Sequence, residues 1–286
     1  MSETDIPANP TRAGFVAVIG APNAGKSTLV NRLTGTKVSI VSPKVQTTRA
    51  RVLGIRIEGR TQIAFMDTPG LFKPRRRLDR AMVAAAWGGA GEADRTLLLV
   101  DAAHGLDEDT TAIVARLKAM GRTDVILALN KVDIADKPKL LALADTLNRE
   151  GVFSDVFMIS AETGNGVDDL LAFLAARMPE GPWLFPEDQV SDMPERMLAA
   201  EIVREQLYRQ LRQELPYQAT VETESWQDRK DGSVRIEQTI YVQRESQRSI
   251  VLGKKGERIR AIGQTARQEL ESILERRVHL FLFVKV

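Results

Sequence analysis

A glycine-bracketed octapeptide decides the fold of this chain: Gly20-Ala21-Pro22-Asn23-Ala24-Gly25-Lys26-Ser27. It fits the phosphate-loop pattern GxxxxGK[ST], directly follows the apolar run Phe15–Ile19 and opens a predicted helix at Lys26–Leu33. Glycine lets backbone N–H groups approach phosphate oxygens, and the start of a helix adds a favourable partial charge. Lys26 is placed to reach the β and γ phosphates, and Ser27 supplies a hydroxyl for Mg²⁺. The octapeptide therefore predicts a site for a nucleoside triphosphate.

The surrounding sequence, from Gly14 to about Met178, alternates short apolar runs with helical patterns, which is typical of a parallel sheet covered by helices. Strands are predicted at Phe15–Ile19, Val52–Glu58, Gln62–Met66, Thr96–Val100, Asp124–Leu129 and Asp155–Ile159. Helices are predicted near Lys26–Leu33, Asp107–Met120, Lys137–Arg149 and Gly166–Arg177. Several strands are continuously apolar, as expected where both faces of a sheet are covered. We therefore expect an α/β fold with a doubly wound, mostly parallel sheet.

The pattern changes after a proline-rich stretch, residues 179–194, which we interpret as an ordered linker. A small α+β domain is expected beyond it, with elements at Glu195–Leu215 (helix), Ala219–Trp226 and Ser233–Gln243 (strands), Thr265–Glu275 (helix) and Val278–Val284 (strand). The predicted organisation is a flexible N-terminus (1–12), a nucleotide-binding domain (13–178), the linker (179–194) and the second domain (195–286).

Composition narrows the class of protein. With 286 residues, 43% of them hydrophobic, the chain is expected to bury a sizeable core in about two domains. The absence of cysteine excludes a disulfide framework and a thiol nucleophile, and it favours a cytoplasmic setting. No apolar run approaches the roughly 18 residues of a spanning helix, and the polar first residues do not resemble a signal peptide. Since the net charge is only +2, a nucleic-acid site must be a local patch.

Asn130-Lys131-Val132-Asp133, after the predicted strand at Asp124–Leu129, indicates which base is bound. The Asp133 carboxylate can accept two hydrogen bonds from the N1–H and N2–H₂ edge of guanine, whereas adenine offers no such pair and would leave the charge poorly satisfied. Asn130 is expected to brace the loops, and the stem of Lys131 to cover one face of the base. Ser160-Ala161-Glu162 is expected to bring backbone N–H groups near the guanine O6. The base is predicted to be guanine.

Two further segments complete the expected phosphate site. Asp67-Thr68-Pro69-Gly70 ends the predicted strand at Gln62–Met66, so that Asp67 is expected to hold Mg²⁺ through water and the Gly70 N–H to touch a γ-phosphate. The polar loop Val41–Arg51 contains Thr47 and Thr48, and a threonine in such a loop can ligate Mg²⁺ when the γ-phosphate orders it. We favour Thr48, while two threonines that merely approach a strand remain an alternative.

The second domain contains a basic loop, Gly253-Lys254-Lys255-Gly256, that predicts RNA binding. A GxxG loop between an apolar strand end and a helix, in the order strand, strand, helix, helix, strand, is typical of a type II KH domain, which lies along about four single-stranded nucleotides. The predicted RNA contacts are Ile250, Gly253, Lys254, Lys255, Gly256 and Arg258, with Val251 and Ile259 adding to an apolar floor for bases. Residues 244–260 carry six basic and two acidic side chains. A solvated basic turn is the alternative.

These motifs together, with QTTR at residues 46–49, DTPGL at 67–71, NKVD at 130–133 and SAETG at 160–164, resemble the translation-factor class of GTPases, specifically the Era family of bacterial ribosome-assembly GTPases. The resemblance runs over nearly the whole chain. It implies binding of GTP and GDP with Mg²⁺, GTP hydrolysis, and partners at the 3′ end of 16S ribosomal RNA and the 30S ribosomal subunit, without DNA. It also implies peripheral attachment to the inner membrane, for which we find no lipidation signal.

Ras-like enzymes position the attacking water with a glutamine directly after the glycine of this motif, whereas here Leu71 follows Gly70. Leu71 cannot hydrogen-bond to water. The resemblance implies that K⁺ replaces an arginine finger and is held partly by Asn23, whereas a plain turn residue is the alternative for Asn23. We thus expect the catalytic residues at the reacting phosphate to be Asn23, Lys26, Thr48 and Gly70. The nucleotide-binding set is residues 20–28, ending at Thr28, with Asp67, Thr68, Pro69, Gly70, Asn130, Lys131, Asp133, Ser160, Ala161 and Glu162.

Two other function classes compete with a GTP-hydrolysing switch. A metabolic phosphotransferase that uses GTP would need a substrate pocket and acid or base residues beyond these motifs, and the sequence offers none. A structural RNA-binding protein that keeps a nucleotide only for stability would bind GTP without turnover. The only histidines, His104 and His279, lack the serine or cysteine context of a catalytic triad, and we expect structural roles for them.

Overall fold

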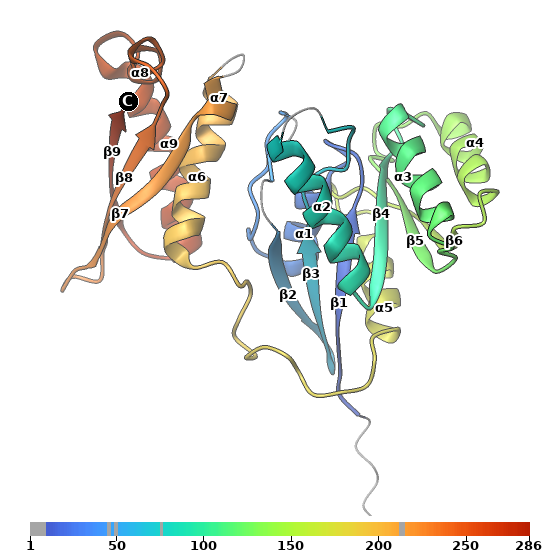
Figure 1. Cartoon of the computed structure of the whole chain (residues 1–286). Coiled ribbons are helices and arrows are strands. Elements are labelled where there is room, and N and C mark those ends of the chain that lie inside the picture. The colour runs from blue at the N-terminus through green and yellow to red at the C-terminus, as the bar shows by residue number, and fades with distance from the viewer. Residues whose placement is uncertain (1–9, 45–46, 49–50, 75–76, 212–214) are drawn as a thin grey trace, which may run out of the picture. The chain divides into compact units, whose positions relative to one another are not determined.

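The structure, a computed structural model of the chain, describes residues 10–44, 47–48, 51–74, 77–211 and 215–286. The chain divides into two compact units. The first comprises residues 1–39 and 48–192, and the second comprises residues 40–47 and 193–286 (Figure 1). The short segment 40–47 thus belongs to the second unit although its neighbours in sequence belong to the first.

The first unit is built on a six-stranded sheet in the order β2-β3-β1-β4-β5-β6 (Figure 1). Only the pairing of β2 with β3 is antiparallel, while the other neighbours run parallel. The strands are β1 (Arg12–Ile19), β2 (Val52–Glu58), β3 (Thr61–Asp67), β4 (Arg95–Asp101), β5 (Val125–Asn130) and β6 (Phe153–Met158). The mostly parallel sheet that the sequence predicts is therefore confirmed.

Helices cover both faces of this sheet. They are α1 (Lys26–Thr34), α2 (Arg77–Glu92), α3 (Glu108–Ala119), α4 (Lys137–Asn148) and α5 (Val167–Ala176). Val16 and Val18 of β1 pack into the apolar cluster that contains α1 and α5, whereas Ala17 and Ile19 pack into the cluster of α2, α3 and α4. Successive side chains of a strand point to opposite faces, so the apolar run Phe15–Ile19 of β1 is covered by helices on both sides and the fold is doubly wound.

Helix α2 is an element that the sequence analysis did not predict. Its segment contains Gly88, Gly89 and Gly91, and each glycine within a helix costs about 1 kcal/mol relative to alanine. The helix forms because Met82, Ala86 and Ala90 are buried. Tertiary packing has outweighed weak local propensity here.

Most of the predicted linker lies along the first unit. The Ala13 N–H donates to the Pro179 carbonyl at 3.1 Å, and the Leu53 N–H donates to Asp192 Oδ1 at 2.9 Å. The Gln62 side chain accepts from the backbone of Leu184 and Phe185, 2.8 and 2.9 Å away. Backbone groups of this stretch thus form hydrogen bonds with residues of strands β1 to β3. The first unit ends at Asp192, and the second unit continues from Met193.

The second unit has a three-stranded sheet in the order β7-β8-β9, antiparallel between β7 and β8 and parallel between β8 and β9. Its elements are α6 (Glu195–Gln210), α7 (Leu215–Gln218), β7 (Thr220–Asp228), β8 (Val234–Tyr241), α8 (Glu245–Leu252), the 3₁₀ turn η1 (Lys254–Gly256), α9 (Glu257–Leu274) and β9 (Val278–Lys285). Helices α6, α8 and α9 contribute buried residues to one core with the sheet. The predicted α+β architecture is confirmed.

Two expectations about this unit are wrong. The residues before Gly253 do not end a strand but form helix α8, and the following helix begins at Glu257 rather than near Thr265. Ser249-Ile250-Val251-Leu252 is apolar enough to suggest a strand, but the amphipathic helix packs Val251 into the core. Among the described residues, no helix is long and apolar enough to cross a membrane.

Candidate functional site

The phosphate loop connects β1 to α1 and relies on its glycines. Gly20 and Gly25 have φ of 155° and 99°. A Cβ atom on Gly20 would lie 2.4 Å from the Leu99 carbonyl oxygen, and one on Gly25 would lie 2.3 Å from Asn130 Nδ2. The loop can therefore follow this path only with glycine at both positions, which leaves its backbone free of side chains on that side.

Lys26 begins α1 and turns back over the loop. Its buried Nζ donates hydrogen bonds to the carbonyl oxygens of Gly20 and Ala21, 3.2 and 2.9 Å away. Burial lowers the pKa of Lys26 to about 8, while the nearby charge of Asp67 acts in the opposite direction. The amino group is thus held at the loop, at the place where the sequence predicts phosphate binding.

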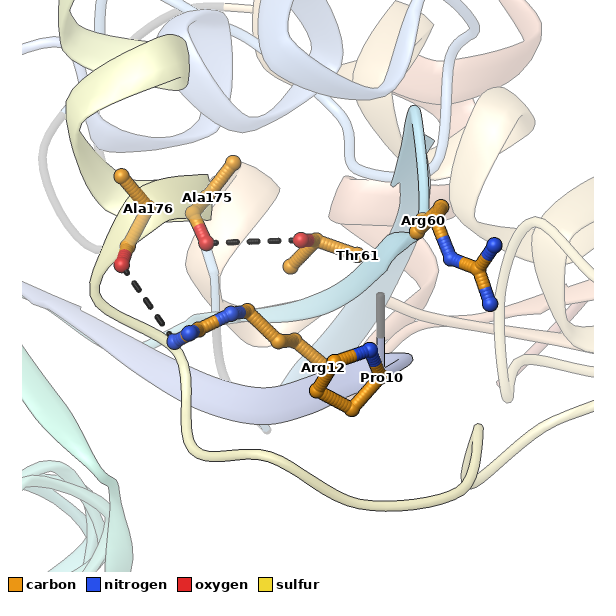
Figure 2. A pocket seen from close by; sticks show the side chains of 6 residues that line it. All are labelled: Pro10, Arg12, Arg60, Thr61, Ala175 and Ala176. Carbon is orange, nitrogen blue, oxygen red and sulfur yellow. Dashed lines mark hydrogen bonds between the residues drawn. The ribbon is translucent and has the colours of Figure 1, made fainter. Parts of the chain in front are cut away.

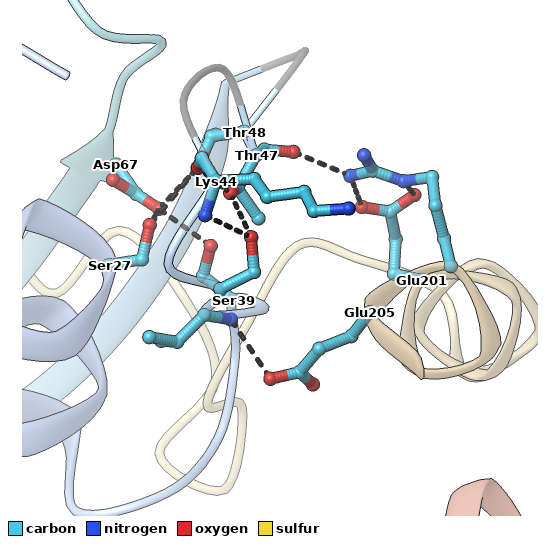
Figure 3. A network of polar contacts seen from close by, with 11 residues as sticks. Ser27, Ser39, Lys44, Thr47, Thr48, Asp67, Glu201 and Glu205 are labelled. Atoms are coloured by element: carbon cyan, nitrogen blue, oxygen red, sulfur yellow. Dashed lines mark hydrogen bonds and ion pairs between the residues drawn. The ribbon is translucent and has the colours of Figure 1, made fainter. Parts of the chain in front are cut away.

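Four oxygen-bearing side chains converge at the end of β3 (Figure 3). Asp67 Oδ2 accepts hydrogen bonds from Ser39 Oγ at 2.6 Å, Ser27 Oγ at 2.7 Å and Thr48 Oγ1 at 3.4 Å. Ser27 Oγ and Thr48 Oγ1 are 3.0 Å apart. Asp67 is fully buried, and burial raises its pKa although the three hydroxyl hydrogen bonds act against this shift.

This cluster fits Mg²⁺, which prefers carboxylate and other oxygen ligands. Asp67 Oδ1 is buried and has no hydrogen-bond partner among the residues that the structure describes. An unpaired buried carboxylate oxygen beside two hydroxyl groups is the donor set that a divalent cation would satisfy. Ser27, Thr48 and Asp67, the three residues predicted for Mg²⁺, therefore lie together.

The two candidate threonines lie in different surroundings. Thr48 Oγ1 contacts Ser27 and Asp67, whereas Thr47 Oγ1 donates to the Lys44 carbonyl at 2.8 Å and lies 2.7 Å from Ser42 Oγ. The geometry favours Thr48 as the residue at the cation site. Gln46 and Arg49, which belong to the predicted QTTR motif, lie outside the described residues.

The segment after Asp67 packs against the phosphate loop. A Cβ on Gly70 would lie 3.0 Å from the backbone of Pro22, and the Leu71 N–H donates to the Gly20 carbonyl at 2.9 Å. Thr68 Oγ1 donates to the Val18 carbonyl at 2.8 Å, so this hydroxyl is used within the fold. Pro69 is buried beside them, and Leu71 is 1% exposed. Gly70 thus brings its backbone against the loop, and Leu71 packs inward.

Asn130 links the phosphate loop to the loop after β6. Its Nδ2 donates to the Ala24 carbonyl at 2.9 Å, and its Oδ1 accepts from the Ala161 N–H at 2.9 Å. Asn130 is 2% exposed, so these hydrogen bonds are shielded from water. The predicted brace is in place, and it occupies the Ala161 N–H that we expected to face the base.

Lys131 and Asn23 meet at the edge of the phosphate loop. Lys131 Nζ donates to the Asn23 carbonyl at 2.9 Å and to Asp101 Oδ2 at 2.6 Å. Both residues have left-handed backbones, with φ of 68° for Lys131 and 62° for Asn23, a conformation that asparagine tolerates better than most residues. Asp133 and Glu162 are exposed, and Ser160 is buried with its Oγ accepting from the Thr163 N–H at 3.1 Å.

Three residues of this region were missed by the sequence analysis. Besides Ser39, they are Asn31 and Arg32 of α1. Asn31 Oδ1 accepts from the N–H groups of Val38 and Ser39, both at 2.9 Å. Arg32 Nε donates to the Ala161 carbonyl at 3.1 Å, and its Nη2 donates to the Glu162 carbonyl. No sequence motif marks these residues, because their partners are far along the chain or are backbone groups.

The GxxG loop joins α8 to α9. Gly253 and Gly256 have φ of 72° and 77°, and a Cβ on Gly253 would lie 2.7 Å from Arg258 Cβ. Lys254 and Lys255 between them are exposed. Arg258 Nη1 donates to the Ile250 carbonyl at 2.8 Å, so this guanidinium ties the loop to α8. The loop therefore presents two lysines on a turn that requires glycine.

The expected apolar floor is partly wrong. Ile250 is 47% exposed and can contact a ligand, but Val251 is fully buried in the core of the second unit. Because α8 is a helix, adjacent residues point in different directions, and only one of the pair can face outward. Ile259 is half-buried against the same core.

A pocket of about 310 Å³ lies elsewhere in the first unit (Figure 2). It adjoins the amino ends of β1 and β3, and its lining residues are Pro10, Arg12, Arg60, Thr61, Ala175 and Ala176. The predicted motifs follow the carboxyl ends of the strands, where ligands bind in open α/β sheets. The pocket is therefore separate from the candidate site.

Comparisons with known proteins agree with this arrangement. The family model described as 50S ribosome-binding GTPase matches residues 15–131, and a KH domain model matches residues 214–286. The chain is 62% identical to GTPase Era of Brucella suis biovar 1 (strain 1330) over 279 residues, 98% of this chain and 89% of the relative. It is 61% identical to GTPase Era of Rhizobium meliloti (strain 1021) over 284 residues, 99% and 90% of the two chains.

Solved structures extend the similarity to the fold. A crystal structure of an Aquifex aeolicus Era variant bound to GDP and AlF₄⁻ matches with a TM-score of 0.90 and 41% identity, over 96% of this chain and 94% of that one. Era in complex with MgGDPNP and nucleotides 1506–1542 of 16S ribosomal RNA matches equally well, with the same TM-score, identity and coverage. With the phosphate loop, the guanine motif and the GxxG loop in place, this chain belongs to the Era family of GTPases.

Proposed function

We propose that this protein is a GTP-hydrolysing switch whose KH domain binds the 3′ end of 16S ribosomal RNA and assists assembly and maturation of the 30S subunit. The observation that carries the enzymatic part is the convergence of Ser27, Thr48 and Asp67 beside the phosphate loop. The RNA-binding part rests on the GxxG loop, and on the RNA present in a complex of an Era protein of 41% identity.

Each residue of the nucleotide site has its own role in binding GTP and Mg²⁺. Lys26 supplies positive charge to the β and γ phosphates, and the phosphate-loop backbone donates N–H groups to them. Ser27, Thr48 and Asp67 would hold Mg²⁺, which neutralises charge on the phosphates when bound. The Gly70 N–H contacts the γ-phosphate. Asp133 accepts from the guanine edge, and Asn130 holds the loops on either side of the base.

Hydrolysis requires a water in line with the γ-phosphate, and Leu71 cannot orient it because its side chain is apolar and buried. We propose that backbone groups orient the water and that K⁺, held partly by Asn23, supplies positive charge in place of an arginine. Asn23 is exposed at the loop, with its carbonyl fixed by Lys131. Its side chain is therefore available to a cation.

The second unit supplies the RNA contacts. Lys254 and Lys255 meet phosphates, Gly253 and Gly256 permit close approach of the backbone, and Ile250 contacts a base. Arg258 shapes the loop through its hydrogen bond to Ile250. We assign the GTPase domain to residues 13–178 and the KH domain to residues 195–286, and we place the protein in the cytoplasm. Peripheral attachment to the inner membrane stays a prediction of the family resemblance.

A phosphate-release assay with and without 30S subunits tests the proposal. The protein with GTP and Mg²⁺ should release phosphate slowly, and 30S subunits should change the rate. ATP should not be hydrolysed, because adenine cannot pair with Asp133. Tight GTP binding without turnover, alone and with 30S subunits, would instead indicate a structural RNA-binding protein that keeps a nucleotide for stability.

A further inference from the structure

The loop after β6 carries the motif Ser160-Ala161-Glu162, which we expect to bring backbone N–H groups near the guanine O6. Most N–H groups of residues 160–165 already donate hydrogen bonds to carbonyl or side-chain oxygens of the first unit. They belong to Ser160, Ala161, Thr163, Gly164 and Asn165. The Glu162 N–H, by contrast, has no hydrogen-bond partner within the described parts of the chain. It is therefore the donor of this loop that remains for a bound base.

Arg32 of α1 binds the carbonyl groups on either side of this N–H. Its Nε donates to the Ala161 carbonyl at 3.1 Å, and its Nη2 donates to the Glu162 carbonyl. A Cβ atom on Gly164 would lie 3.6 Å from Arg32 Nη1, so the guanidinium also lies close beside this glycine. Helix α1 and the loop both belong to the first unit. The planar fork of one arginine thus bridges two successive peptide groups of the loop.

The geometry of the peptide group fixes where the Glu162 N–H points. The Ala161 carbonyl and the Glu162 N–H belong to one planar trans peptide, so their bonds point in opposite directions. Because Arg32 binds the carbonyl from the side of α1, the N–H is directed away from α1. Asn130 Oδ1 holds the preceding N–H, that of Ala161, at 2.9 Å. The peptide that carries the free donor is therefore restrained by Asn130 before it and by Arg32 at its carbonyl.

We propose that Arg32 is a positioning residue for guanine recognition: it orients the Ala161–Glu162 peptide so that the Glu162 N–H donates to O6 of the base. This inference rests on the proposed recognition of guanine by Asp133. Guanine has an acceptor at O6, whereas adenine carries an amino group at the same position. The oriented N–H therefore adds a second point of discrimination to Asp133, which accepts from N1–H and N2–H₂.

The test measures how strongly the protein reads O6, with and without Arg32. GDP, 6-thio-GDP and IDP each displace a fluorescent GDP analogue from the wild type and from Arg32→Ala. In 6-thio-GDP a sulfur, which is a weak acceptor, replaces O6, while N1–H and N2–H₂ remain. IDP keeps O6 and lacks the N2 amino group that Asp133 binds. The two analogues therefore separate the contact at O6 from the contact at Asp133.

One hydrogen bond to O6 should make the wild type bind GDP about tenfold more tightly than 6-thio-GDP. Arg32 is exposed, so water replaces part of what Arg32→Ala removes, and GDP affinity should fall by about fivefold only. Affinity for 6-thio-GDP should stay nearly unchanged, which lowers the preference for GDP to about twofold. IDP should lose affinity as GDP does, so the ratio of GDP to IDP affinity should keep its wild-type value.

A purely structural role for Arg32 predicts a different result. Arg32 lies in the last turn of α1, where a positive charge stabilises the helix. Loss of that effect alone would lower the melting temperature and leave the ratio of GDP to 6-thio-GDP affinity unchanged. Arg149→Ala is the matched control, since Arg149 also stands at the end of a helix and pairs with Asp145 at 2.6 Å instead of with the loop. It should show the wild-type ratios.

Alanine favours the helix at position 32, so Arg32→Ala should fold, and Arg32→Lys provides a second variant if it does not. Lysine keeps the charge but has no fork to bridge two carbonyls, so its preference for GDP over 6-thio-GDP should lie between those of wild type and Arg32→Ala. A wild-type preference in both variants, or no such preference in the wild type, would overturn the inference and leave the role of Asp133 intact. Equal wild-type affinity for GDP and ADP would instead overturn the proposed function.

Discussion

Ser27 Oγ donates a 2.7 Å hydrogen bond to Asp67 Oδ2, which joins the first turn of α1 to the end of β3. The phosphate loop and the segment after β3 are thereby fixed to each other at the candidate cation site. Thr48 Oγ1, at 3.0 Å from the same Ser27 Oγ, adds a group from a third segment. The three residues lie together although 19 and 21 positions separate Thr48 from Asp67 and Ser27.

Ser27→Ala should reduce GTP hydrolysis by about 100-fold, because it removes a proposed Mg²⁺ ligand and one of the hydroxyl groups on Asp67. Chelation of Mg²⁺ with EDTA should abolish hydrolysis by the wild-type chain. Ser154→Ala, at an exposed position of β6, is the control and should behave as the wild type. Rates of phosphate release that are equal in Ser27→Ala and wild type would rule out this role for Ser27.

Asn130→Ala should weaken both stability and nucleotide binding. It leaves the buried Ala24 carbonyl and Ala161 N–H without their partner, which costs about 1–3 kcal/mol of unfolding free energy. Urea denaturation measures this loss, and titration with a fluorescent GDP analogue measures the affinity. The exposed Asn148, at the end of α4, provides the control Asn148→Ala. An unchanged urea midpoint would show that the two loops do not depend on the brace.

Asn23→Gly should remove the stimulation of GTP hydrolysis by K⁺. Glycine keeps the left-handed backbone of this position, whereas alanine would add strain there, so the variant isolates the side chain. Wild-type rates should be higher in K⁺ than in Na⁺ at equal ionic strength. Equal rates in the two salts, unaffected by the substitution, would leave Asn23 as a turn residue only.

Replacement of Lys254 and Lys255 by alanine should weaken binding of an oligonucleotide with the sequence of the 16S 3′ end. Two lost phosphate contacts should reduce the slope of log affinity against log salt by about 1.4. Guanine-nucleotide affinity should be retained. Arg229→Ala with Lys230→Ala, in the exposed turn after β7, is the charge-matched control. RNA affinity is measured by fluorescence anisotropy at moderate salt. If the Lys254 and Lys255 substitutions leave this affinity unchanged, the loop does not contact the RNA.

The nucleotide site was largely predictable from the sequence. The phosphate loop, DTPG and NKVD each follow a largely apolar, buried strand, and parallel strands bring their carboxyl ends to one edge of the sheet. Asp67 and Asn130 therefore had to lie near the phosphate loop. Local sequence also placed glycine where the backbone demands it, as at Gly25 and Gly253.

Other features depend on contacts that no local pattern encodes. Helix α2 contains glycines and forms because the sheet buries Ala86 and Ala90. The roles of Ser39 and Arg32 follow from partners 28 and 129 residues away. Val41 and Thr47 stand in a stretch whose sequence is that of an ordinary polar loop, and their hydrogen bonds to Glu205 and Arg204 span more than 150 residues. Such pairings arise from the tertiary fold alone.

The central claim, hydrolysis of a nucleotide recognised as guanine by Asp133, is tested most directly by phosphate release from GTP and XTP by wild type and Asp133→Asn. Xanthine carries an oxygen in place of the guanine N2–H₂ group, so an asparagine amide can donate to it while its carbonyl accepts from N1–H. The wild type should prefer GTP, and Asp133→Asn should prefer XTP. Failure of the wild type to hydrolyse GTP, or the same preference in both proteins, would contradict the account.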